Sequence, residues 1–204
     1  PVIISEITDE EQYNKLTENA PAVAIFTLAA NETGTQIVLG FDSNGIIGTG
    51  IGDVLEKLDG KIIPAFRVAS EAAADALAAY AKENDLRDMY VVSDDAALVA
   101  RAWRAWNYLR GVVDFSSYSG SDFENIRSSA MSSGARVVIL PTYSMNKENV
   151  AYLQDRYIVA WANVGSTAAD NVKAINCGVL GVITEDRAVT EECFTKYYVK
   201  NTLT

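Results

Sequence analysis

Short apolar segments alternate with helical segments along the whole chain. Eight of the apolar segments have the length of buried β-strands: Val2–Ser5, Pro21–Leu28, Ile62–Val68, Met89–Val92, Val112–Phe115, Val137–Leu140, Ile158–Trp161 and Val179–Ile183. Most of their residues are apolar in continuous runs and do not alternate with polar residues. Runs of this kind are typical of parallel strands that are covered on both faces.

Capping residues predict a helix after each of these strands. Thr8 with Glu11 forms a capping box for a helix to about Glu18, and Ser70 caps a helix from Glu71 to Asn84. Ser121 with Glu124 forms a second capping box, for a helix that ends near Gly134. The other helices are expected at Gly52–Leu58, Asp95–Tyr108, Lys147–Arg156, Ser166–Asn176 (closed by Gly178) and Val189–Tyr197.

Eight consecutive strand–helix units favour a closed (β/α)₈ TIM barrel, an α/β fold. The alternative is an open doubly wound parallel sheet. A small hairpin is expected as an insertion after the second strand, from Thr35–Phe41, the turn Asp42–Gly45 and Ile46–Ile47. No Pro/Ser-rich linker divides the chain, so residues 1–204 are predicted to form a single domain. The start at Pro1 suggests a processed protein or a domain excised from a longer protein.

The composition narrows the chemistry that this domain can perform. The net charge of −10 argues against nucleic acid as a partner, and no segment predicts direct membrane insertion. The chain contains no histidine, which excludes imidazole acid–base chemistry, Ser/His/Asp and Cys/His sites, and His-ligated zinc. Cys177 and Cys193 could form a disulfide, but two buried free thiols are the preferred interpretation.

In a TIM barrel, function lies on the loops after the strands. Three carboxylates occupy such positions: Glu6, Asp42 and Asp114. They are candidates for acid–base catalysis or for binding a hard cation, Ca²⁺ or Mg²⁺. Asp42 is the candidate metal ligand. Arg67, Trp161 and Asn163 are candidates for ligand binding, because a guanidinium suits a phosphate or a carboxylate. Asp94 and Asp95 are read instead as charges at the start of a helix.

The second half of the chain carries a family resemblance. Val159-Ala160-Trp161-Ala162-Asn163, and then Gly178 through Asp186 with the sequence Gly-Val-Leu-Gly-Val-Ile-Thr-Glu-Asp, are similar to the last two strands of the glycerophosphodiester phosphodiesterases. Tyr90-Val91-Val92-Ser93 also resembles a serine-containing strand in the middle of that barrel. The resemblance, to the phosphatidylinositol-phospholipase-C-like barrels, covers residues 61–190.

The resemblance implies hydrolysis of a phosphodiester, with two histidines as acid and base and carboxylates that hold a divalent cation. This chain departs from that pattern at nearly every position. The first strand has no His-Arg-Gly, and the Glu-x-Asp metal pair would fall on Phe26 and Leu28. The resemblance implies a His-Asp pair in the hairpin, of which this chain has only Asp42. It implies Glu-x-Lys in the third strand, of which this chain has only a positive charge, at Arg67.

We therefore expect a degenerate, non-catalytic member of this family, a pseudoenzyme with a binding or scaffolding role. Its expected partner is a small phosphorylated or anionic ligand, or an adjacent domain of the same protein, and no cofactor is expected. The resemblance favours a bacterial, extracellular or cell-surface protein connected with lipid metabolism. One alternative is a metal-dependent phosphodiester hydrolase that acts on glycerophosphodiesters by a histidine-free mechanism; another is a cell-surface carbohydrate-binding module.

Overall fold

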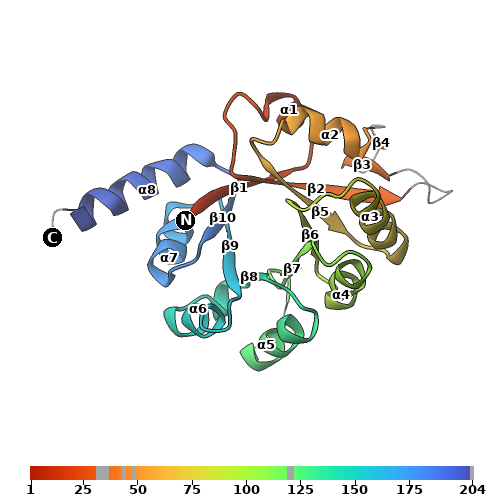
Figure 1. Cartoon of the computed structure of the whole chain (residues 1–204). Helices are drawn as coiled ribbons and strands as arrows, with labels where there is room; N and C mark the ends of the chain where they lie inside the picture. The colour runs from red at the N-terminus through yellow and green to blue at the C-terminus, as the bar shows by residue number, and fades with distance from the viewer. Residues whose placement is uncertain (31–36, 43–44, 47–48, 119–121, 203–204) are drawn as a thin grey trace.

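Eight parallel strands form a closed barrel at the centre of the computed structural model (Figure 1). The strands are β1 (Val2–Ile7), β2 (Val23–Ala30), β5 (Ile63–Val68), β6 (Tyr90–Ser93), β7 (Arg110–Asp114), β8 (Val137–Leu140), β9 (Val159–Gly165) and β10 (Gly181–Thr184). Closure is direct, because β1 pairs with β10 on one side and with β2 on the other. The predicted TIM barrel is thereby confirmed, and the open doubly wound sheet is wrong.

The structure describes residues 1–30, 37–42, 45–46, 49–118 and 122–202, with side chains over 1–30, 49–118 and 122–197. The helices are α1 (Glu10–Lys15), α2 (Ile51–Leu58), α3 (Glu71–Glu83), α4 (Ala96–Ala105), α5 (Phe123–Ser132), α6 (Lys147–Gln154), α7 (Ala168–Cys177) and α8 (Arg187–Thr202). A short 3₁₀ helix spans Thr142–Ser144.

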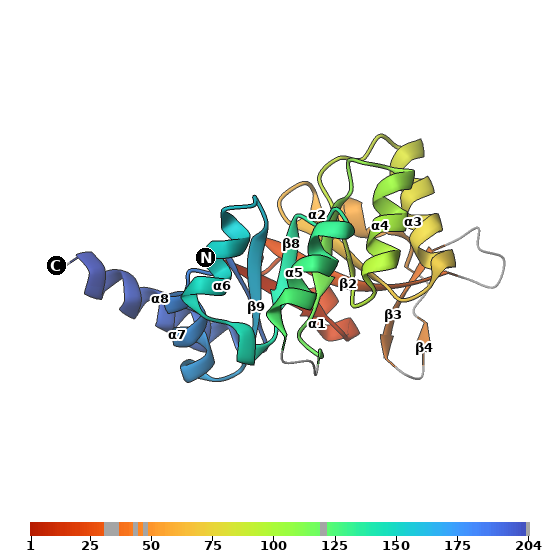
Figure 2. The same cartoon turned by 90° about the horizontal axis from the view of Figure 1, so that it is seen from below.

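The predicted hairpin follows β2 and extends the sheet on its outer side. Strand β3 (Ile37–Asp42) pairs antiparallel with β2, and the short β4 (Gly45–Ile46) pairs with β3. Figure 2 shows this hairpin at one end of the molecule, beyond the ring of helices. The residues on either side of β4 lie outside the described part of the chain.

Capping side chains start the helices, though not always those that the sequence predicted. Ser70 and Asp95 accept backbone N–H groups at the starts of α3 and α4, as expected. Asp9, and not Thr8, caps α1, because Thr8 is bonded instead to Gln12 Oε1, and the helix ends at Lys15 and not at Glu18. Asp122 caps α5; the predicted cap, Ser121, lies outside the described residues.

Two apolar clusters hold the barrel together. The larger cluster lies between the outward faces of the strands and the helices; the smaller fills the barrel interior with residues such as Ile4, Ile25 and Ile139. Within the interior, Trp161 packs against Gly181, where an added Cβ would stand 2.7 Å from the indole Cδ1. A close approach of this kind requires glycine.

The thiols of Cys177, half-buried on α7, and Cys193, buried on α8, are free, as predicted. Among the described residues, no helix has the length and apolar character needed to cross a membrane.

Candidate functional site

The candidate site lies at the mouth of the barrel, where the strands end. On each strand every second residue faces the interior, and the last inward-facing residue therefore reaches the mouth. Ile4, Ala65, Val112 and Trp161 belong to the interior cluster. The residues two positions later on the same strands are Glu6, Arg67, Asp114 and Asn163. This alternation places the four at the mouth.

Arg67 joins two of these residues in an ion-pair network. Its Nε donates to Glu6 Oε1 at 2.8 Å, and its Nη1 donates to Asp114 Oδ2, also at 2.8 Å. The three side chains come from the first, third and fifth barrel strands and are partly shielded from solvent, at 22% exposed for Arg67, 28% for Glu6 and 11% for Asp114. Three residues proposed separately from the sequence thus form one network across the mouth.

The two carboxylates determine the charge state of Arg67. Burial by itself would lower the pKa of the guanidinium, but the charges of Glu6 and Asp114 and their hydrogen bonds outweigh burial. The pKa of Arg67 is therefore raised above its ordinary value, and the side chain stays protonated. A guanidinium held in this state can bind an anion but cannot exchange a proton in catalysis.

Backbone contacts fix the acceptors at the mouth. Asp114 Oδ1 accepts from the N–H of Ser116 at 2.9 Å, which leaves Oδ2 for Arg67. Asn163 Oδ1 accepts from the N–H of Gly165 at 3.3 Å, and the exposed side chain keeps its amide donors. Trp161 lies deeper, 3% exposed, with its ring 5.1 Å from that of Tyr90. Trp161 therefore lies below the mouth, inside the barrel, and is not exposed to a ligand at the mouth as Asn163 is.

The remaining acidic residues considered from the sequence are Asp42, Asp94 and Asp95. Asp42 ends β3, and its side chain lies outside the described residues, so its role as a metal ligand stays a prediction. Asp95 caps α4 as expected, with Oδ1 at 2.8 Å from the N–H of Ala97, and the neighbouring Asp94 is exposed.

The described residues do not fit the divalent cation that the resemblance implies. Phe26 and Leu28, to which the sequence assigned the metal pair, face outward into the larger apolar cluster. The inward-facing positions on β2 are one residue further along, at Thr27 and Ala29, and neither is a carboxylate. Where side chains are described, no three acidic or thiol groups are grouped to hold a metal, and Glu6 and Asp114 already share the cation of Arg67.

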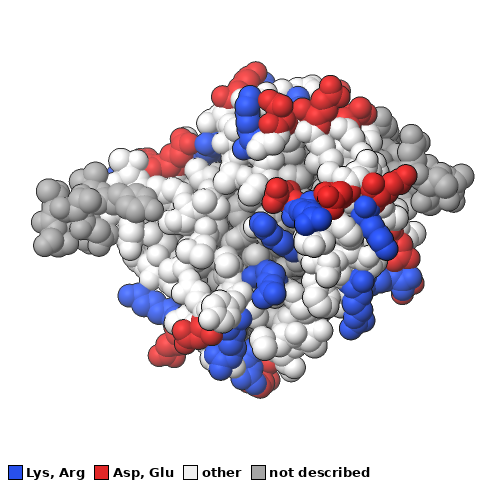
Figure 3. All heavy atoms as spheres, in the orientation of Figure 1, with Lys and Arg blue, Asp and Glu red and all other residues white. Residues whose placement is uncertain are grey.

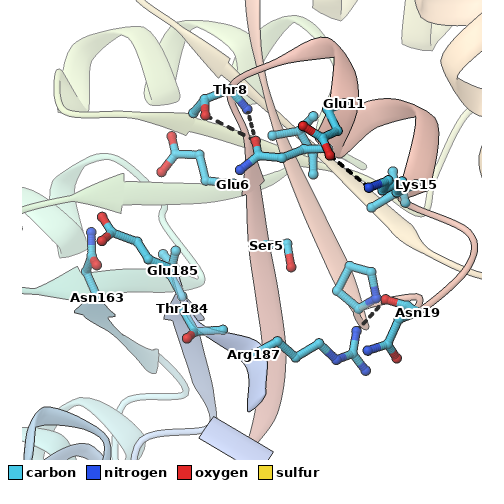
Figure 4. A pocket seen from close by; sticks show the side chains of 15 residues that line it. Ser5, Glu6, Thr8, Glu11, Lys15, Asn19, Asn163, Thr184, Glu185 and Arg187 are labelled. Atoms are coloured by element: carbon cyan, nitrogen blue, oxygen red, sulfur yellow. Dashed lines mark hydrogen bonds and ion pairs between the residues drawn. The ribbon is translucent and has the colours of Figure 1, made fainter. Parts of the chain in front are cut away.

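A pocket of about 620 Å³ opens beside the mouth, on the outer side of β1 (Figure 4). It includes Glu6 and Asn163, but also Ser5, Lys15 and Arg187, which the sequence did not single out. No local pattern could have identified these residues, because the pocket exists only where α1, β10 and the start of α8 meet around β1.

Comparison with known proteins identifies the fold. No family model matches the chain, and no curated protein matches it. Among solved structures, a phosphodiesterase from Oleispira antarctica, solved with its product sn-glycerol-3-phosphate, has a TM-score of 0.76 at 10% identity and covers 96% of this chain and 97% of its own.

Two further structures support the same assignment. A glycerophosphoryl diester phosphodiesterase from Parabacteroides distasonis has a TM-score of 0.71 at 12% identity, covering 97% of this chain and 87% of its own. A glycerophosphodiester phosphodiesterase from Thermotoga maritima has a TM-score of 0.67 at 15% identity, covering 96% and 97%. The chain therefore has the (β/α)₈ barrel fold of the glycerophosphodiester phosphodiesterases.

Proposed function

We propose that this chain is a non-catalytic barrel of the glycerophosphodiester phosphodiesterase type, with a binding or scaffolding role. The observation that carries the proposal is the bridge from Arg67 to both Glu6 and Asp114 at the mouth. A phosphodiesterase needs a proton for the leaving oxygen and positive charge that is free to meet the phosphoryl group. Here the positive charge at the mouth is already bound by two carboxylates.

The missing proton donor supports the same proposal. Without histidine, the acid–base candidates of the chain are carboxylates, lysines and tyrosines. The carboxylates that converge at the mouth accept hydrogen bonds from Arg67, and Arg67 itself remains protonated. The network is thus built to hold charge in place and not to move a proton.

A binding role is compatible with the donors that remain at the mouth. A guanidinium has five N–H groups, and Arg67 gives one from Nε and one from Nη1 to its two carboxylates. Its other donors and the amide of Asn163 are the groups on which the expected small phosphorylated or anionic ligand would bind. An adjacent domain that presents a carboxylate would use the same donors.

The histidine-free hydrolase is the second candidate, because Glu6 and Asp114 do converge. It requires Arg67 to release at least one of them and Asp42 to join the site. The carbohydrate-binding alternative needs aromatic side chains exposed in a groove. Trp161 is buried, and none of the residues that line the 620 Å³ pocket is aromatic.

Two assays on the purified chain test the proposal. The first measures release of glycerol 3-phosphate from glycerophosphodiesters with Mg²⁺ or Ca²⁺, and we expect no release above a protein-free blank. Hydrolysis that Asp114→Asn or Asp42→Ala abolishes would refute the non-catalytic role. The second measures the melting temperature with added Ca²⁺ or Mg²⁺, and a saturable increase would reveal a competent cation site and favour the hydrolase.

The binding role has its own measurement. Glycerol 3-phosphate is titrated while the melting temperature is followed, and a saturable increase that Arg67→Gln removes is expected. Arg101→Gln is the matched control, because Arg101 is also paired with carboxylates but lies on the outer surface of α4. An increase that survives in Arg67→Gln would place the ligand elsewhere.

A further inference from the structure

The outward face of β1 is less well covered than its neighbours. Ile3 and Ser5 point outward and are only half-buried. The paired residues of the adjacent strands, Ala24 opposite Ser5 on β2 and Val182 opposite Ile3 on β10, are both 0% exposed. The ring of helices therefore has a gap over β1.

The two helices that border this gap explain it. Helix α1 has only six residues, none of them buried, so it shields little of the strand. Helix α8 starts beside the mouth but runs away from the barrel, as Figure 1 shows for the blue helix that ends at the C-terminus. The 620 Å³ pocket occupies the space left between them, a volume common for small-molecule sites.

The end of the pocket at the barrel mouth is acidic. Glu6, Glu185 and Asn163 lie together there in Figure 4. Glu185 is exposed, and its carboxylate has no hydrogen bond or ion pair to any other described residue. Glu6 uses Oε1 for Arg67 and keeps Oε2. These oxygens can accept the N–H groups of an ammonium ion.

The opposite end of the pocket, its basic end, holds two cations, Arg187 and Lys15, each of which is paired with a carboxylate. Arg187 crosses to the loop after α1, where its Nη1 donates to the carbonyl of Asn19 at 2.5 Å, and its Nε donates to Glu191. Lys15 lies on the same side of the pocket in Figure 4 and is paired with Glu11 at 2.8 Å. The remaining N–H donors of Arg187 and Lys15 can meet a carboxylate.

The strand register gives the distance between the two ends. The carbonyl of Ile3 accepts from the N–H of Ala22 at 3.0 Å, so the loop at Asn19–Pro21 lies near the level of Ile3. Glu6 is three residues further along β1. At about 3.3 Å per strand residue, the acidic and basic ends are separated by roughly 10 Å.

We propose that this pocket binds an extended zwitterion whose ammonium and carboxylate groups lie about 10 Å apart. The simplest such ligand is a tripeptide with free ends, because an extended chain spans at most about 3.3–3.6 Å per residue. Its ammonium lies at Glu185 and Glu6, and its carboxylate at Arg187. The site shares Glu6 and Asn163 with the mouth, but it goes beyond the proposed role of the mouth, since Ser5 and Ile7 on the outer face of β1 also line it.

The middle of the pocket suits a peptide backbone. Gln12 Oε1 accepts from Thr8, which orients the amide and leaves its nitrogen without a partner in the part of the chain that is described. Ser5, a half-buried residue, lies between the two ends of the pocket in Figure 4. Ile7 and Leu16 supply apolar surface for side chains.

Calorimetric titration of the full chain with Ala-Ala-Ala, N-acetyl-Ala-Ala-Ala and Ala-Ala-Ala-amide tests the proposal. We expect saturable binding of the free tripeptide and about tenfold weaker binding of each blocked peptide, since each loses one charged contact. In Glu185→Gln, the N-acetylated and free peptides should bind with equal affinity. In Arg187→Gln, the amidated and free peptides should bind with equal affinity.

Acidic and basic side chains are interspersed over the face of the molecule shown in Figure 3, so matched controls are needed to separate these effects from general changes in charge. Glu148→Gln and Arg104→Gln alter exposed residues outside the pocket and are expected to bind and discriminate as the unmodified chain does. Failure of Ala-Ala-Ala to bind, equal affinity for all three peptides, or unchanged discrimination in Glu185→Gln would overturn the proposal. The glycerophosphodiester assay is independent of this outcome. If Arg187→Gln does not fold, the proposal is tested by Glu185→Gln alone, through its relative affinity for the free and N-acetylated peptides.

Discussion

Replacement of Arg67 by glutamine tests the network at the barrel mouth most directly. The change removes the guanidinium that binds Glu6 and Asp114 and leaves two partly buried carboxylates without their cation. The glutamine side chain is neutral and shorter by two atoms, so both the positive charge and the hydrogen bonds to the two carboxylates are lost. We expect Arg67→Gln to fold but to be clearly less stable than the unmodified chain.

The size of the loss follows from the burial of the three side chains. Removing one partner of a fully buried ion pair costs about 3–5 kcal/mol, whereas an exposed pair contributes about 0–1 kcal/mol. The side chains here are 11–28% exposed, which places the network nearer the buried case. We expect a loss of about 2–3 kcal/mol in the free energy of unfolding at pH 7, or roughly 5–10 °C in melting temperature.

Urea denaturation at pH 7 provides the assay. Arg101→Gln, which removes a pair with Asp75 that is about half exposed, should cost clearly less stability than Arg67→Gln. Equal losses in the two variants would refute the reasoning.

Three further predictions concern the scaffold. Trp161→Ala should lower the free energy of unfolding by about 3–5 kcal/mol in urea denaturation, because the indole fills the barrel interior; a loss under 1 kcal/mol would contradict that placement. Gly181→Ala should cost about 1–3 kcal/mol, since its methyl group would meet Trp161, whereas Gly50→Ala, with open space around it, is the control. Ser70→Ala should cost about 1 kcal/mol by thermal denaturation through loss of the α3 cap, and an unchanged melting temperature would argue against that cap.

Much of the fold could be predicted from local patterns. Continuous apolar runs identified all eight barrel strands, and Ser70, Asp95 and Gly178 were correctly assigned to helix ends. These features depend on a few neighbouring residues, so they are visible in sequence. Helix ends were less accurate where two polar residues compete for one role, as Thr8 and Asp9 do before α1.

The faces of the strands were harder to assign than the strands themselves. On β2 the resemblance placed the metal pair at Phe26 and Leu28, but both face the helices. A shift of one residue turns every side chain of a strand to the other face. In a strand that is apolar on both faces, nothing in the sequence fixes which residues point inward. Only the pairing of β2 with β1 and β5 decides it.

The sequence by itself determined the succession of eight strand–helix units, the absence of imidazole chemistry, and the polar residues that end the strands. Only the tertiary structure decided that Glu6, Arg67 and Asp114 bind one another, and that the gap over β1 places Glu185 and Arg187 at opposite ends of one pocket. The physical reason is distance along the chain. Arg67 is 61 residues from Glu6 and 47 from Asp114, and only barrel closure brings such residues within hydrogen-bond range.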